Sequence, residues 1–191
     1  KTVKGLSLFP EQDSGKNYNS NSLLFHHGIL YVGANYGASI YCYNEATGEK
    51  YAIPIPANYL KGNFEIIQSL CVDKQQNLWC SAGINGLYIY NIPSRKWIKH
   101  VNQQDDNLIA AVFQLVSDED GNVWCNSSAG LYVFNTRNFH FKNYTLHDGL
   151  ITESNGGYLI ALANHQLAYN NIAGAGRSFG IINTYKSDDS V

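Results

Sequence analysis

Asp118, Asp120 and Asn122 stand at alternate positions, the spacing at which a calcium-binding loop places its oxygen ligands. Such a loop also needs a glycine at its sixth position and a glutamate at its twelfth. Gly121 falls at the wrong position, and no glutamate follows at the required distance. We therefore predict a plain β-turn here and no metal site.

Histidine and carboxylate side chains could perform acid–base chemistry, but the sequence carries no recognised catalytic motif. It has no His-Glu-x-x-His pair, no Gly-x-Ser-x-Gly elbow and no phosphate-binding glycine loop. The six histidines are dispersed along the chain. We expect no catalytic residue and no cofactor.

An internal repeat must position whatever chemistry the chain performs. The segment Asp73-Lys74-Gln75-Gln76-Asn77-Leu78-Trp79 returns as Asp118-Glu119-Asp120-Gly121-Asn122-Val123-Trp124, 45 residues later. Downstream, Gly86-Leu87-Tyr88-Ile89-Tyr90-Asn91 returns as Gly130-Leu131-Tyr132-Val133-Phe134-Asn135. A weaker copy precedes these two and a degraded one follows. A period of about 40–50 residues with several short strands per unit is typical of a β-propeller blade.

Each unit is predicted to form four antiparallel strands. In the second unit the strands are expected at 65–72, 78–82, 87–91 and 96–101, with the last as the half-exposed outer edge. The chain is thus predicted to be an all-β propeller segment over residues 1–191. Its units are 20–63, 64–107 and 108–150, with a degraded unit at 151–191. These units could close as four blades or form part of a larger ring.

Tryptophan and cysteine recur at fixed positions of the repeat. Trp79 and Trp124 are expected to pack between blades, because a repeating core requires the same side chain at the same phase. If Asp118 pairs with Val123 across the turn, the equivalent register places Cys71 directly opposite Cys80. We expect two packed free thiols there, with a disulfide as the alternative in an oxidising compartment.

The zinc-binding pattern is also absent. No Cys-x-x-Cys pair occurs, and the four cysteines are scattered over three units. The cysteines are therefore assigned a structural role.

The composition excludes several classes of partner. The chain is 45% hydrophobic, which is enough for a sizeable core, and its formal charge of -2 gives no attraction to nucleic acid or to anionic lipid. No run of 18 apolar residues occurs, so any membrane contact is expected only through segments outside this chain.

The repeated motif resembles the two-component regulator propeller repeat. The resemblance rests on Asp118-Glu119-Asp120-Gly121-Asn122-Val123-Trp124, on Gly130-Leu131-Tyr132-Val133-Phe134-Asn135, and on Tyr144-Thr145-Leu146-His147-Asp148-Gly149-Leu150, which resembles the element leading into the next blade. It covers roughly residues 20–170. It implies a seven-bladed ring in the periplasmic sensor region of a hybrid two-component histidine kinase, whose kinase lies outside this chain. Many such sensors respond to oligosaccharides.

The expected ligand site lies where the turns between second and third strands share one face with the linkers between blades. The candidate residues there have groups that bond to hydroxyls or stack on a sugar ring; they are Asn35, Tyr36, Asn85, Asn126, Ser127 and Ser128.

Three functions stay open at this point. The first is a non-catalytic, periplasmic sensor segment without a cofactor, which binds an oligosaccharide or a related small molecule and forms a homodimer. The second is a lyase-type propeller enzyme using His100, His147 and Glu153. The third is a scaffold for protein interaction or dimerisation.

Overall fold

The computed structural model of this chain describes residues 8, 20–34, 39–60, 66–102, 106, 110–150, 157–170 and 179–184. Within these residues the strands form four antiparallel sheets, each built from strands that follow one another in the chain. We name the sheets blades one to four in chain order. They confirm the predicted all-β fold of small antiparallel sheets.

Blade one contains β1 (Ser20–His26), β2 (Ile29–Ala34), β3 (Ser39–Asn44) and β4 (Lys50–Pro54). Blade two contains β5 (Ser69–Val72), β6 (Asn77–Ser81), β7 (Leu87–Asn91) and β8 (Lys96–Val101). Blade three contains β9 (Val112–Ser117), β10 (Asn122–Ser127), β11 (Gly130–Asn135) and β12 (Phe141–Tyr144). Blade four contains β13 (Leu159–Leu162), β14 (Gln166–Asn170) and β15 (Phe179–Asn183).

Among the described residues, two short 3-10 helices, η2 (Ala57–Tyr59) and η3 (Leu146–Asp148), follow blades one and three. In the part of the chain described here, no helix is long and apolar enough to cross a membrane.

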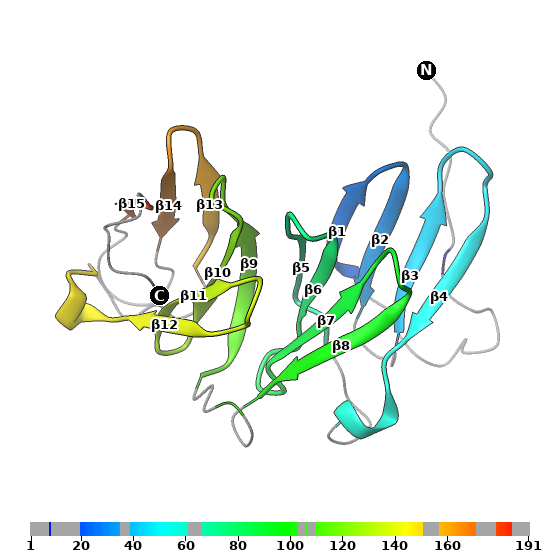
Figure 1. Cartoon of the computed structure of the whole chain (residues 1–191), viewed down its shortest axis with the longest axis horizontal. Helices are drawn as coiled ribbons and strands as arrows, with labels where there is room; N and C mark the ends of the chain where they lie inside the picture. The colour runs from blue at the N-terminus through cyan, green and yellow to red at the C-terminus, as the bar shows by residue number, and fades with distance from the viewer. Residues whose placement is uncertain are drawn as a thin grey trace.

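The first strands of the blades lie next to one another. Strand β1 contacts β5, β5 contacts β9, and β9 contacts β13. Figure 1 shows these strands following one another through the middle of the view, with β4, β8 and β12 further out. Strand β8 mixes exposed and half-buried side chains, as predicted for an outer strand. The sheets are therefore set side by side around their first strands.

The turn between the first and second strands fixes the register of blades two and three. The backbone N–H of Asp73 donates to the carbonyl of Asn77 at 3.0 Å, which closes a three-residue loop. The last loop residue is left-handed, with φ of 61° at Gln76 and 88° at Gly121, as a hairpin loop of this length requires. The predicted pairing of Asp118 with Val123 assumed a longer loop and is wrong.

The cysteine pairing built on that register is also wrong. Cys71 lies opposite Trp79, and Cys80 lies opposite Leu70. A shift of one residue moves a side chain to the other face of its sheet, so Cys71 and Cys80 face different blades. All four cysteines are free and buried. Burial raises the pKa of each thiol, which makes them poor nucleophiles near neutral pH.

The hydrophobic cores lie between the blades. Trp79 of blade two is fully buried, and its ring centroid lies 5.6 Å from that of Phe134 in blade three. Trp124 of blade three packs in one cluster with Leu159 and Leu167 of blade four. Neighbouring blades thus bury the apolar faces that they turn towards each other, as a repeat architecture requires.

The repeated aspartate, asparagine and tryptophan form a hydrogen-bonded unit. In blade two the carboxylate of Asp73 accepts the indole N–H of Trp79 at 2.7 Å, the side-chain amide of Asn77 at 2.9 Å, and two backbone N–H groups of the turn. In blade three Asp118 accepts the indole N–H of Trp124 at the same distance. The motif therefore closes the turn and orients the tryptophan that packs on the next blade.

Candidate functional site

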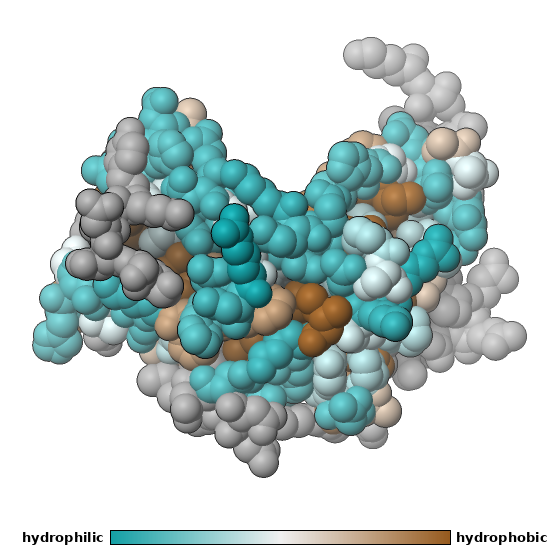
Figure 2. Space-filling model, in the orientation of Figure 1, coloured by the Kyte–Doolittle hydropathy of each residue, from teal (hydrophilic) through white to brown (hydrophobic). Residues whose placement is uncertain are grey.

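A hollow of about 730 Å³ lies where the first strands of the blades meet. We call it the inner-strand hollow, and its lining residues are Asn21, Ser22, Leu23, Ile66, Gln68, Ser69, Leu70, Phe113, Gln114, Leu115, Gly157 and Tyr158. All four blades contribute to this lining. Figure 2 shows the molecule hollowed between the part that carries β13 and β14 and the part that carries β1 and β2, with mostly hydrophilic residues on the visible surface there.

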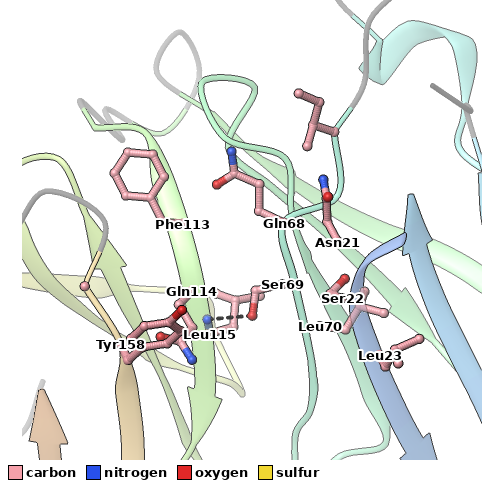
Figure 3. A pocket seen from close by; sticks show the side chains of 12 residues that line it. Asn21, Ser22, Leu23, Gln68, Ser69, Leu70, Phe113, Gln114, Leu115 and Tyr158 are labelled. Atoms are coloured by element: carbon pink, nitrogen blue, oxygen red, sulfur yellow. Dashed lines mark hydrogen bonds between the residues drawn. The ribbon is translucent and has the colours of Figure 1, made fainter. Parts of the chain in front are cut away.

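Side-chain hydrogen bonds between blades hold the walls of the hollow. The hydroxyl of Ser69 accepts the backbone N–H of Leu115 at 3.0 Å, as Figure 3 shows. The side-chain oxygen of Gln114 accepts the backbone N–H of Leu159 at 2.6 Å. Polar side chains on the first strand thus tie blade two to blade three, and blade three to blade four.

A second row of ties comes from the ends of the second strands. The hydroxyl of Ser81 donates to the carbonyl of Val112 at 2.6 Å, and the amide of Asn126 donates to the carbonyl of Gly157 at 2.6 Å. Blade one has Gly33 at this position, where an added Cβ atom would lie 2.5 Å from a methyl carbon of Ile67. Blades one and two are therefore in direct contact at this level.

The walls of the hollow combine hydrogen-bonding groups with aromatic rings. Figure 3 places the amides of Asn21 and Gln68 on one side and Phe113, Gln114 and Tyr158 on the other. Tyr158 is 63% exposed, so its ring is accessible to a ligand. Amides can donate to and accept from hydroxyl groups, and an exposed ring can stack on a sugar. Among the described residues, no group of His, Cys, Asp or Glu could hold a metal ion.

Of the predicted turn residues, Asn85, Asn126, Ser127 and Ser128 lie in the described part of the chain, and none of them is among the lining residues of the hollow. Asn126 and Ser127 are fully buried at the end of β10, where Ser127 donates to the carbonyl of Gly130 at 2.8 Å. Ser128 is exposed and accepts the backbone N–H of Ala111 at 3.1 Å.

Asn85 is also buried, and its carbonyl bonds to the ring Nε2 of His100 at 2.8 Å. Asn35, Tyr36 and Glu153 lie outside the described residues.

Sequence reasoning did not identify the residues of the hollow. The lining residues Gln68, Phe113, Gln114 and Tyr158 precede or begin the first strands, whereas the predicted ligand residues lie in the turns between second and third strands. One sequence pattern could have indicated them. Ser69 and Gln114 are polar residues that each precede a leucine in the first strand of a blade, at equivalent positions of the repeat.

Comparison with known proteins supports the fold. No family model matches the sequence, and no curated protein matches it. Among solved structures, the extracellular domain described as that of a hybrid two-component system, BT4673 from B. thetaiotaomicron, has a TM-score of 0.61 and 20% identity over 85% of this chain and 21% of its own. The corresponding domain of BT3049 from B. thetaiotaomicron has a TM-score of 0.66 and 17% identity over 88% of this chain and 22% of its own.

A third similar structure is PorZ, a surface component of the type-IX secretion system of Porphyromonas gingivalis. Its TM-score is 0.70, with 15% identity over 88% of this chain and 25% of its own. The chain thus spans a quarter or less of the length of these three structures. At such identities the likeness establishes the fold alone. The two B. thetaiotaomicron domains come from hybrid two-component systems, the class of protein whose propeller repeat the sequence motif resembles.

Proposed function

We propose that this chain is a non-catalytic, ligand-sensing segment of the periplasmic region of a hybrid two-component sensor histidine kinase. The observation that carries the proposal is the inner-strand hollow, whose amides, hydroxyls and accessible ring suit a hydroxyl-rich ligand. We assign this ligand to the oligosaccharides. The fold shared with the extracellular domains of two hybrid two-component systems supports the sensor role, and the choice of an oligosaccharide rests on the polar lining of the hollow alone.

The segment is proposed to be part of a larger ring of seven blades. On blade one, Leu23 and Phe25 are 66% and 58% exposed on the face opposite the one that packs on blade two. On the last strand of blade four, Phe179 and Ile181 are 71% and 55% exposed. Apolar faces at both ends of the row support further blades on either side, because propeller sheets bury such faces against neighbours.

Signalling through such a segment requires linkage between binding and arrangement. The ligand must bind one arrangement of the sensor more tightly than another, and a coupling free energy of about 1–3 kcal/mol is ordinary for such systems. A hollow built from several blades suits this role, since a ligand that contacts all of them stabilises one relative placement. The kinase that reads this change, and a homodimer through the sensor, are parts of the same proposal.

Isothermal titration calorimetry against a panel of oligosaccharides tests the proposal. We expect saturable binding of at least one of them, weakened roughly tenfold by Gln68→Ala or Tyr158→Ala and unchanged by Lys96→Ala on the outer strand. Products are analysed by chromatography after incubation. Absence of binding across the panel, or turnover of a bound sugar, would contradict the sensor assignment, and turnover lost on His100→Ala would support the enzyme.

A further inference from the structure

A second cavity, of about 620 Å³, lies between the outer parts of blades one and two. We call it the side groove, and its lining residues are Ile29, Tyr31, Asn44, Glu49, Tyr51, Ala52, Ile53, Pro54, Tyr90, Ile92, Arg95 and Trp97. It shares no lining residue with the inner-strand hollow. A ligand of the side groove therefore occupies a different site from the ligand proposed above, and its binding can be tested separately.

The repeat itself indicates why the groove is open. Between blades two and three, Phe139 packs on Trp79 with ring centroids 5.8 Å apart. One repeat earlier, Tyr31 stands at the position of Trp79, and Arg95 stands at the position of Phe139. Arg95 and Phe139 share the left-handed backbone conformation, with φ of 54° and 61°. The groove thus opens where the indole ring of the packed interface is replaced by the smaller phenol of Tyr31 and the phenyl ring by the guanidinium group of Arg95.

The inner part of the groove gathers phenol hydroxyls. Tyr31 and Tyr90 are 3% and 8% exposed, and neither side chain has a hydrogen bond to another described residue. Burial raises the pKa of Tyr31 to about 12, and it also raises the pKa of Tyr51 and of Tyr90. All three phenols therefore keep their protons at neutral pH and can donate hydrogen bonds. Tyr51 lies directly opposite Cys42 on the neighbouring strand, and the thiol of Cys42 donates to the carbonyl of Ile40.

Arg95 supplies a positive charge beside these hydroxyls. Its guanidinium group lies near enough to Tyr90 to oppose the rise in that pKa. In the described residues Arg95 makes no side-chain hydrogen bond or ion pair, so its donors remain available to a ligand. A guanidinium group binds carboxylates in a bidentate manner, and such charge-assisted hydrogen bonds are strong.

Apolar side chains form the remaining wall. Trp97 is held by its indole N–H, which donates to the carbonyl of Pro54 at 2.7 Å, and its ring meets that of Tyr90 edge-on at 5.2 Å. The side chains of Ile29, Ile53 and Ile92 also line the groove. Asn44 and Glu49 lie at the turn end, where Asn44 already accepts two backbone N–H groups. The carboxylate of Glu49 can accept bonds from ligand hydroxyls.

We propose that the side groove binds a small organic carboxylate. The carboxylate group lies between the guanidinium of Arg95 and the hydroxyls of Tyr31 and Tyr90, and the body of the ligand packs on Trp97 and the isoleucines. A sugar acid and an aromatic acid share this chemistry. Glu49 favours a sugar acid, because its carboxylate can accept hydrogen bonds from the hydroxyls of the sugar. The apolar wall favours an aromatic acid.

Calorimetry on the 191-residue chain compares two acids with their neutral counterparts, namely glucuronate with glucose and 4-hydroxybenzoate with 4-hydroxybenzyl alcohol. We expect one acid to bind saturably and its neutral counterpart to bind at least roughly tenfold more weakly. Binding of the acid should also shift the nuclear magnetic resonance signal of the Trp97 indole N–H. The acid that binds identifies the source of the carboxylate.

Two substitutions of one residue sharpen the test. Arg95→Gln should weaken binding of the acid roughly tenfold or more, whereas Lys96→Gln on the neighbouring exposed residue should not. Arg95→Phe should fold, because Phe139 occupies the equivalent position, and it should close the groove and abolish binding. Failure of both acids to bind, equal binding of the neutral compounds, or equal loss in Lys96→Gln would overturn the proposal.

Discussion

The side-chain oxygen of Gln114 accepts a hydrogen bond of 2.6 Å from the backbone N–H of Leu159, which lies 45 residues further along the chain. Ser69 accepts the N–H of Leu115 in the same way, 46 residues on. The spacing of the sequence repeat is therefore also the spacing of the bonds that join neighbouring blades. These bonds hold the residues that line the inner-strand hollow. The shape of the hollow therefore depends on how neighbouring blades are placed relative to each other.

Removing one of these ties should destabilise the row. In Ser69→Ala the buried N–H of Leu115 loses its acceptor, and we expect the free energy of unfolding to fall by about 1–2 kcal/mol. Urea denaturation measures the change. Ser94→Ala, on an exposed turn, should cost clearly less. Equal losses in the two variants would mean that the tie between blades contributes no more to stability than a hydrogen bond in an exposed turn.

The aspartate of the repeated motif should tolerate almost no change. In Asp118→Asn the new NH₂ group faces two donors, the indole N–H of Trp124 and the amide of Asn122. Two hydrogen bonds are then lost in a buried turn, and we expect a loss of about 2–3 kcal/mol by urea denaturation. The neighbouring exposed Glu119→Gln keeps an acceptor oxygen and should stay close to wild type. An Asp118→Asn variant as stable as the wild-type chain would show that the hydrogen bonds of this motif do not stabilise the turn.

Stability should fall in alkaline solution. Burial raises the pKa of Cys42 from 9.0 to about 12 and that of Tyr31 from 10.0 to about 12, and it raises the pKa of the other three thiols. Above about pH 9 the unfolded chain releases these protons while the folded chain keeps them, so each step in pH favours unfolding. The contribution is complete below pH 9 and is lost as the pH rises towards 12.

Thermal unfolding at about pH 7.5, 9.5 and 10.5 measures this effect. The midpoint should drop progressively above pH 9, and Cys42→Ala should show a shallower decline than the wild-type chain. A midpoint that is constant or rises over this range would contradict the assignment of buried, protonated thiols and phenols.

The repeat was sufficient to predict the fold. The 45-residue spacing of Trp79 and Trp124, and the turn residues between strands, specify blades of antiparallel strands without further information. The predicted ranges 87–91 and 96–101 coincide with β7 and β8. The predicted register of the hairpin between the first and second strands was wrong. Residue types do not distinguish a three-residue loop from a four-residue loop here, because Gln76 adopts the left-handed conformation that Gly121 takes in the next repeat.

The candidate site was harder to predict, for a physical reason. The inner-strand hollow is built from four blades, so its lining depends on side-chain directions that one register error reverses. Ligand contacts by Asn85, Asn126, Ser127 or Ser128 stay a prediction. The side groove arises from a difference between two repeats, since Arg95 stands where the next repeat has Phe139. That difference indicates a groove only when the side chains packed around the two positions are known.

The central claim is that the sheets lie side by side around their first strands, with Trp79 and Trp124 each packed on the next blade. Nuclear Overhauser effects from the Trp79 ring test this most directly, since its centroid lies 5.6 Å from Phe134 and 5.8 Å from Phe139 in blade three. We expect strong cross-peaks from Trp79 to both phenylalanine rings. A folded sample in which Trp79 contacts only residues of its own sheet would contradict the arrangement, and with it the hollow on which the sensor proposal stands.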